Sequence, residues 1–462
     1  MRRNGIAVHE TEVSRFRALS WFAPAGYADG CLLRANSILA DAHSWPVTTG
    51  FKAGELEGVN LRVPMALDLT IEKLVYGGEG LSRVDGQVVF TPFVLPGEVV
   101  HVAPPASKKH AQRANLISVT KPSDDRVEAG CGIFGKCGGC HYQHIDYPAQ
   151  LRYKRSILAE TLRRGAKIEF DENRIAMVSG DPWGYRNRTQ FHIEGGKVGY
   201  RQMRSQTLIP AEQCPISSPK INEALRKLHR LVKDRRWPKF VTSLEVFTDE
   251  VQVQWNVQEA TQPVAKHFFE WLAREVPGTV PGALDYEVNG DVFGIAGNSF
   301  FQVNRSLVGC LADLAIGEET GATAWDLYAG AGLFSVPLAR KFGKVIAVEA
   351  GRAADDLQRN TLRAGVEVES IRQNTEAFLL EAGDAPEFVL LDPPRAGLGT
   401  TAVERLLELG PKKIVIVACD PATLARDLSG LTSRYEVERL AMVDLFPQTF
   451  HIETIIGLAR KD

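Results

Sequence analysis

The final 180 residues alternate between apolar runs and amphipathic stretches, and this alternation constrains the fold more than any other feature. Apolar runs over 323–328, 344–350, 387–394 and 413–420 are separated by helix-like segments, for example 336–342 and 401–409. Strands that alternate with helices form parallel α/β sheets. From about residue 283 to 462 we therefore predict a doubly wound, Rossmann-like α/β domain that binds its ligands at the carboxyl ends of the strands.

A glycine loop follows the first of these strands. Gly330 and Gly332 let the backbone approach a ligand at a helix N-terminus. The next strand ends in Glu349, nineteen residues after Gly330, where a carboxylate can bind both hydroxyls of a ribose. Leu333–Phe334 replaces the third glycine of a dinucleotide fingerprint, which favours S-adenosylmethionine (SAM) over NAD. Asn374, at the tip of the following strand, is expected near the adenine or in a turn.

Two further strands end in groups that can react. Asp392 ends the fourth strand before two prolines, and Cys419 ends the fifth at the same edge. A thiolate beside a methyl donor can add to carbon 6 of uracil and so make carbon 5 nucleophilic. A base must then remove the carbon-5 proton. His451 and Glu453 are two residues apart and predicted to share one face of the last strand, with Glu453 as the candidate base. Ordinary roles, a buried cysteine and half-buried polar groups, are the alternatives.

The cysteine spacing indicates a metal centre. Cys131, Cys137 and Cys140 form a Cys-x5-Cys-x2-Cys pattern on a glycine-rich loop, and Cys214 can supply a fourth thiolate. Four thiolates suit either a [4Fe–4S] cluster or Zn²⁺, and nearby His141 and His144 keep zinc open. Seven cysteines in 462 residues are too few for a disulfide scaffold, and the clustered spacing of three of them favours metal binding in a reducing compartment. A closed centre of this kind is expected to be structural, or to brace RNA contacts.

Positive charge is local. The chain has a formal net charge of −2, but residues 107–167 carry twelve Lys and Arg against five Asp and Glu, and residues 220–239 carry eight against two. Such segregation predicts a one-sided contact with RNA, although a solvated helix face would explain the second segment equally well. The expected RNA contacts are Lys108, Lys109, Arg113, Arg152, Lys154 and Arg155. With no apolar run near the roughly 20 residues of a membrane span and a poor signal peptide, we predict a cytoplasmic protein without a membrane partner.

The rest of the chain divides into three segments. Residues 1–65 show no clear period and are left unassigned, as a disordered extension or an over-extended start. From 66 to 120, short strands alternate with glycine turns, which predicts a small, OB-like β-barrel that binds RNA. From 121 to 282 the chain mixes the cysteine cluster, a helical pattern over 149–164 and several strand-like pieces, which predicts a central α+β domain.

Several motifs carry a resemblance to a known family. They are CGIFGKCGGCHYQH, FFQVN, DLYAGAGLF, DPPRAG, ACDPATLARD and LFPQTFHIE, in that order. From about Met65 to the C-terminus the chain resembles the SAM-dependent RNA uracil-5-methyltransferases, in particular the 23S ribosomal RNA enzymes with an N-terminal TRAM β-barrel and a [4Fe–4S] cluster. By that resemblance the cluster ligands are Cys131, Cys137, Cys140 and Cys214, the SAM contacts are Gln302, Tyr328, Glu349 and Asp392, the nucleophile is Cys419 and the base is Glu453.

The chain departs from the family pattern at two places, and three rival functions remain. The usual Tyr-x-Ser-Cys-Asn is Ile416–Asp420 here, and the usual asparagine at position 333 is a leucine. The nucleophile is kept, so these changes bear on substrate detail. One rival is a SAM-dependent amino-group methyltransferase, which often has an aromatic residue where this chain has Arg395. The second is a transfer RNA uracil-5-methyltransferase. The third is a non-catalytic RNA-binding protein, a function that would leave Cys419 and Glu453 without a role.

Overall fold

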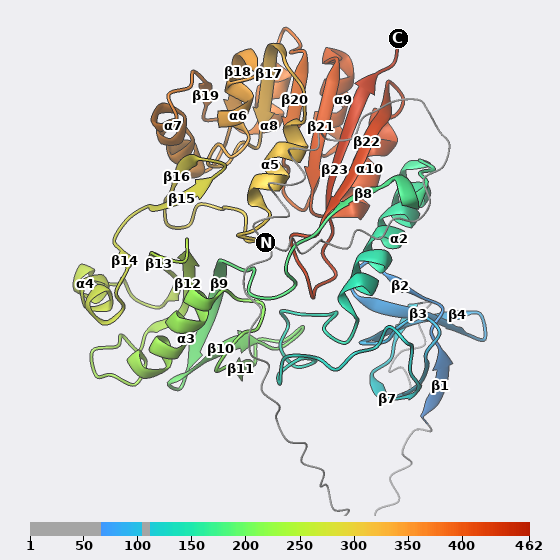
Figure 1. The fold of residues 1–462 in the computed structure, drawn as a ribbon, viewed down its shortest axis with the longest axis vertical. Helices are drawn as coiled ribbons and strands as arrows, with labels where there is room; N and C mark the ends of the chain where they lie inside the picture. The colour runs from blue at the N-terminus through green and yellow to red at the C-terminus, as the bar shows by residue number, and fades with distance from the viewer. Residues whose placement is uncertain (1–65, 104–110) are drawn as a thin grey trace, which may run out of the picture. The chain divides into compact units, whose positions relative to one another are not determined.

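The computed structural model describes residues 66–103 and 111–462 (Figure 1). The predicted extension over 1–65 and the expected RNA contacts of Lys108 and Lys109 lie outside this part of the chain. Among the described helices, none combines the length and hydropathy that crossing a bilayer requires.

The N-terminal described region is rich in β-structure, as predicted. Its strands form two small sheets, in the orders β1-β5-β7 and β2-β3-β4-β6. Inward-facing side chains at alternating positions share one core, which contains Leu69, Ile71, Val89, Val94, Val100, Val102 and Ala114. The strands are β1 (Leu67–Thr70), β2 (Lys73–Val75), β3 (Glu79–Val84), β4 (Gln87–Pro92), β5 (Val99–Val102), β6 (Ala111–Arg113) and β7 (Leu116–Lys121).

The middle of the chain forms a six-stranded sheet in the order β11-β10-β9-β12-β13-β14. Helices α3 (Pro219–Leu231) and α4 (Lys266–Glu275) pack on it through a shared apolar core. Ser218 caps α3 by accepting a hydrogen bond from the Ile221 N–H, and proline follows at the first helical position. The strands are β9 (Arg188–Glu194), β10 (Lys197–Arg201), β11 (Leu208–Pro210), β12 (Val241–Thr248), β13 (Val253–Ala260) and β14 (Thr279–Val280).

The C-terminal region is the predicted α/β fold. Its eight-stranded sheet has the order β19-β18-β17-β20-β21-β23-β22-β8, and the neighbours from β19 to β21 run parallel. All four residues of β20 are buried, as expected for a strand covered on both faces. The strands are β17 (Gly321–Leu327), β18 (Phe342–Val348), β19 (Glu369–Ile371), β20 (Phe388–Leu391), β21 (Lys413–Ala418), β22 (Tyr435–Val443) and β23 (Glu453–Arg460).

Helices connect these strands, and a hairpin precedes them. The hairpin β15–β16 docks on α7, where the Asn360 side chain accepts the Gly294 N–H at 2.7 Å. The elements are β15 (Leu284–Val288), β16 (Asp291–Ile295), α5 (Val308–Ile316), α6 (Ser335–Ala339), α7 (Ala353–Arg363), α8 (Thr375–Glu381), α9 (Thr400–Leu409) and α10 (Pro421–Leu431).

The C-terminal sheet also recruits residues from the segment that we predict as a central domain. Strand β8 (Ala176–Val178), which follows the short 3₁₀ helix η1 (Glu172–Arg174), pairs parallel with β22 at the sheet edge. Helix α2 (Tyr147–Ala166) packs on α10, so closely that a Cβ on Gly165 would lie 2.7 Å from the Ala425 Cβ. The domain boundaries stay a prediction, but α2 and β8 belong to the packing of the C-terminal sheet (Figure 1).

Candidate active site

The predicted site residues meet at one edge of the C-terminal sheet. Because β23 runs antiparallel to its neighbour β21, its first residue lies where β21 ends. Ala418 pairs with Thr454, which makes Cys419 and Glu453 neighbours across the two strands. In sheet order, the edge carries Glu349 after β18, Asp326 and Tyr328 at the end of β17, Asp392 after β20, Cys419 after β21 and Glu453 at the start of β23.

The loop after β17 is held in an unusual conformation. Tyr328 has a φ of +63°, which is rare for a residue other than glycine and concentrates at functional sites. The Gly330 N–H donates to the Glu349 carboxylate at 3.0 Å and fixes that side chain beside the loop. Gly332 has a φ of +91°, a conformation that residues with a Cβ rarely adopt, so glycine is favoured there. The Gly330 bond therefore holds Glu349 beside the loop that Tyr328 begins.

Carboxylates gather at this edge in a setting that disfavours negative charge. The pKa of Asp326 is raised to about 7, first by burial and then by nearby Asp392 and Glu349, against a hydrogen bond from Ser335. Burial also raises the pKa of Asp392 to about 7. Gln302 donates to Asp392 at 3.4 Å, which brings another predicted pair together. A row of poorly solvated carboxylates attracts a cation, and the sulfonium of SAM is one. Sequence reasoning left Asp326 out of the site, although its position at a strand end was a signal.

Asn374 has the turn role that the sequence left open. Its side-chain oxygen caps α8 by accepting from the N–H groups of Glu376 and Ala377, at 2.8 and 3.2 Å. The side chain is exposed. A contact between Asn374 and adenine stays a prediction.

The thiol and the carboxylate at the end of β21 and the start of β23 influence each other. The pKa of Cys419 is raised to about 12, first by burial and then by the charges of Glu453 and Asp392, against the positive charge of Arg395. Glu453 is only 3 % exposed, and burial together with Asp392 holds its pKa well above the usual range. In the absence of ligands the thiol and the carboxyl group are therefore both protonated. The Glu453 carboxylate is a strong base once it is ionised.

One residue of this site comes from the N-terminal β-rich region and was missed. The Tyr76 hydroxyl donates to the backbone carbonyl of Cys419 at 3.3 Å. The pKa of Tyr76 is raised, first by burial and then by Asp420. The Tyr76 ring packs edge-on against Phe450 at a centroid distance of 5.5 Å. No local pattern could have shown this contact, because it joins residues 343 positions apart.

The prediction that His451 shares a strand face with Glu453 is wrong. Strand β23 begins at Glu453, and His451 lies in the preceding loop, where its N–H donates to the Thr449 hydroxyl. The His451 ring contacts Arg395, with 3.4 Å between ring nitrogen and guanidinium. Burial and the positive charge of Arg395 lower the pKa of His451 to about 3, so the ring is neutral. This geometry leaves Glu453 as the base candidate.

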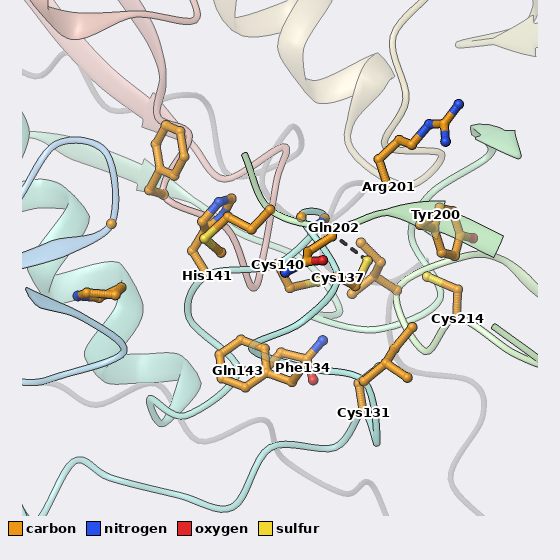
Figure 2. A pocket seen from close by; sticks show the side chains of 18 of the residues that line it. Cys131, Phe134, Cys137, Cys140, His141, Gln143, Tyr200, Arg201, Gln202 and Cys214 are labelled. Carbon is orange, nitrogen blue, oxygen red and sulfur yellow. Dashed lines mark hydrogen bonds between the residues drawn. The ribbon is translucent and has the colours of Figure 1, made fainter. Parts of the chain in front are cut away.

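The four predicted cysteine ligands line one cavity of about 740 Å³. Figure 2 shows Cys131, Cys137 and Cys140 on one loop and Cys214 on a separate segment, after β11. Burial is the main cause that raises the thiol pKa of Cys131, of Cys137 to about 11 and of Cys140 to about 12. The Gly139 N–H donates to Cys137 Sγ at 3.4 Å. Within the described residues, no three His, Cys, Asp or Glu side chains are arranged to hold a metal ion.

The chemistry of this donor set nevertheless fits a four-thiolate centre. Four partly buried thiols line a single cavity, and an N–H already points at one sulfur. Of the two histidines that kept zinc open, His141 lines the cavity, whereas His144 stacks on Phe134 and has its pKa lowered to about 3 by burial. Thiols therefore dominate the donors in the cavity.

The expected RNA contact of Lys154 is wrong. Its side chain is fully buried, and its ammonium donates to Asp444 Oδ1 at 2.6 Å. Residues 150, 154, 157 and 158 are buried along α2. Their i, i+4, i+7, i+8 spacing is that of an inward helix face and indicates in the sequence that Lys154 is buried. Arg113 and Arg152 are exposed and pair with Glu79 and Asp125, so their RNA contacts stay predictions, as does that of half-buried Arg155.

Comparisons with known proteins bear on the family. The sequence profile described as tRNA (Uracil-5-)-methyltransferase matches residues 284–461. An uncharacterized RNA methyltransferase of Aquifex aeolicus is 33% identical over 429 residues, covering 86% of this chain and 99% of that protein. A 23S rRNA (uracil(1939)-C(5))-methyltransferase of Alkalilimnicola ehrlichii is 31% identical over 438 residues, covering 85% and 96%.

A solved structure shares the fold. It is the Pyrococcus abyssi tRNA (uracil-54, C5)-methyltransferase in complex with S-adenosyl-L-homocysteine, with a TM-score of 0.69 and 23% identity. The match covers 85% of this chain and 100% of that chain. The likeness therefore extends well beyond the C-terminal sheet.

Proposed function

This chain belongs to the SAM-dependent RNA uracil-5-methyltransferase family, and we propose that it methylates carbon 5 of a uridine in 23S ribosomal RNA. The observation that carries the proposal is the pairing of Cys419 with Glu453, at the edge that also holds the carboxylate row. An amino-group methyltransferase would leave that thiol and carboxylate without work. The choice of 23S ribosomal RNA is supported by the Alkalilimnicola ehrlichii relative, which is named for that substrate and which this chain matches over nearly its whole length.

The proposed reaction begins at Cys419. Its thiol first loses a proton to water, a step that the positive charges of Arg395 and of a bound sulfonium favour. The thiolate then forms a bond to carbon 6 of the uracil, and the carbon 5–carbon 6 electron pair shifts towards the carbonyl oxygen on carbon 4. Carbon 5 of this enolate attacks the methyl carbon of SAM, and the sulfur leaves with the bonding electrons as S-adenosylhomocysteine.

Glu453 completes the proposed cycle. Its carboxylate, once it has lost its own proton to water, takes the proton from carbon 5, and the freed electron pair restores the carbon 5–carbon 6 double bond. The bond between carbon 6 and the sulfur breaks in the same step and returns the Cys419 thiolate. A carboxylate with a strongly raised pKa suits this task, because carbon acids give up protons only to effective bases.

We propose that Cys131, Cys137, Cys140 and Cys214 hold a [4Fe–4S] cluster. When bound, a cluster supplies four iron–thiolate bonds that cross-link the loop over 131–140 to the segment around Cys214. The proposed methyl transfer needs no electron from it. Anaerobically purified protein with four irons and four sulfides per chain would support the assignment, whereas one zinc per chain would overturn it.

RNA mapping tests the substrate. Mass spectrometry of ribosomal and transfer RNA from cells with and without the gene should show one or more 5-methyluridines in 23S ribosomal RNA that depend on the gene. A gene-dependent methyluridine found only in transfer RNA would favour a transfer RNA uracil-5-methyltransferase, the second candidate function, which the description of the matching family supports. A gene-dependent methyl group on a nitrogen or ribose oxygen would contradict both.

A further inference from the structure

The loop over 444–452 joins β22 to β23 and ends directly before the proposed base. Hydrogen bonds from segments of the chain outside β22 and β23 hold its backbone. Its peptide carbonyls at 445, 446, 447 and 448 each accept a hydrogen bond from a different earlier part of the chain. We propose that these donors form a positioning device for the Glu453 carboxylate. The inference rests on the proposed function and deepens it, because it names residues that govern proton removal from carbon 5.

Three buried side chains satisfy the first three carbonyls. Asn304 Nδ2 donates to the Leu445 carbonyl at 3.1 Å, and Lys154 Nζ donates to the Phe446 carbonyl at 3.0 Å. The Tyr185 hydroxyl donates to the Pro447 carbonyl at 3.0 Å. All three donors are at most 1 % exposed, so water does not substitute for them. The Phe446 carbonyl also accepts from the Thr449 hydroxyl within the loop, at 2.8 Å. Because an unpartnered buried carbonyl is costly, the loop path follows these donors.

The fourth carbonyl connects the loop to the cysteine segment. The Gln448 carbonyl accepts from the backbone N–H groups of His141 and Tyr142, at 2.9 and 3.0 Å. These residues directly follow Cys140, a proposed cluster ligand. The His141 ring also packs against Phe450, at a centroid distance of 4.6 Å. Any change in the path of the cysteine segment therefore reaches the loop within a few residues of Glu453.

Helix α2 fixes the loop at two further points. The Lys154 ammonium forms an ion pair with Asp444 at 2.6 Å, and the Tyr147 hydroxyl donates to the same carboxylate at 2.9 Å. Gln150 and Gln448 make reciprocal bonds, one between their side chains and one from the Gln448 N–H, both at 3.0 Å. Gln448 has a φ of +67°, a conformation that a residue with a side chain rarely adopts without such support.

This arrangement separates the base from the nucleophile. Cys419 follows β21, which is paired on both sides within the sheet by β20 and β23. Glu453 directly follows the loop and is the first residue of its strand. Loosening one donor should therefore slow the step that uses Glu453 while leaving addition by Cys419 and methyl transfer nearly unchanged.

The test compares two tyrosine-to-phenylalanine variants. Tyr185→Phe removes the donor to the Pro447 carbonyl, and Tyr435→Phe removes an equally buried hydroxyl that donates to the Pro411 carbonyl at 2.9 Å, at the opposite end of β23. Two single-turnover rates are measured on 23S ribosomal RNA transcripts. Adduct formation with 5-fluorouridine transcripts reports the steps before the base, and tritium release from transcripts labelled at carbon 5 reports the base step.

We expect Tyr185→Phe to slow tritium release about tenfold or more while adduct formation stays within about twofold, and Tyr435→Phe to leave both rates unchanged. Equal slowing of both rates, slowing of neither, or the same selective loss in Tyr435→Phe would overturn the inference. If Tyr185→Phe does not fold, Asn304→Asp takes its place and removes the donor to the Leu445 carbonyl. The same selective slowing of tritium release relative to adduct formation is expected of it. If Glu453→Gln releases tritium normally, the proposed function itself fails. If only Tyr185→Phe does so, this inference alone fails.

Discussion

Cys419 and Glu453 are neighbours, yet the chain holds them in different ways. Cys419 follows a strand whose residues 414–418 are all buried, and neighbouring strands fix it on both sides. Glu453 follows a loop whose carbonyls bond to residues at least 141 positions away in the sequence. The nucleophile therefore follows a strand fixed by the sheet, with one tertiary bond from Tyr76 to its carbonyl. The proposed base pairs with Val443 at the start of β23 but follows a loop that tertiary contacts hold. Substitutions far from the sheet should thus affect the two residues unequally.

The largest effect that sharpens this comparison concerns stability. Lys154→Met should lower the free energy of unfolding by about 3–5 kcal/mol, because it leaves the buried Asp444 carboxylate without its partner. Arg152→Met, two residues away, removes an exposed pair with Asp125 and should cost less than about 1 kcal/mol. Denaturant unfolding measures both variants. Similar losses in the two would show that Lys154 is not buried as described.

A smaller effect concerns the two buried aspartates of the site. Asp326 and Asp392 both have pKa values of about 7, so they are mainly neutral at pH 6 and mainly ionised at pH 8. The SAM cation should therefore bind about tenfold more tightly at pH 8 than at pH 6. S-adenosylhomocysteine lacks the sulfonium charge and should show a much weaker trend in the same calorimetric titrations. An identical pH dependence for both ligands would rule out this role of the carboxylates.

The smallest effect tests whether the N-terminal β-rich region contributes to the nucleophile side. Tyr76→Phe deletes one hydroxyl that donates to the Cys419 carbonyl but keeps the ring on Phe450. We expect adduct formation with 5-fluorouridine RNA to slow about twofold to fivefold, which corresponds to one neutral hydrogen bond. RNA affinity should not change. If RNA affinity falls and the adduct rate at saturating RNA does not, Tyr76 serves RNA binding instead.

The same contrast explains how much of the site could be predicted from sequence. Glu349, Asp392 and Cys419 each follow an apolar run, so local periodicity was enough to place them at one sheet edge. The α/β fold and the β-rich N-terminal region followed from the same kind of signal. Tyr76 and the donors to the loop over 444–452 had no such signal, because only tertiary packing brings them to the site.

Two errors have equally physical causes. Lys154 belongs to a basic stretch of the sequence, which predicts an RNA contact, whereas its position on α2 turns it inward to pair with Asp444. His451 was placed on a strand because it precedes Glu453 by two residues, whereas the bond from its N–H to Thr449 keeps it in the loop. For Lys154 the deciding contact is Asp444, which is distant in the sequence. For His451 it is the local turn formed with Thr449.

The most direct test of the central claim is the fate of RNA bound to Glu453→Gln. The account predicts that this variant still adds Cys419 to the uracil and transfers the methyl group, and then accumulates a methylated RNA–protein adduct that survives denaturing gels. Tritium at carbon 5 should be retained, and the adduct should disappear in the Cys419→Ala, Glu453→Gln double variant. Normal turnover by Glu453→Gln, or an adduct that persists without Cys419, would contradict the account.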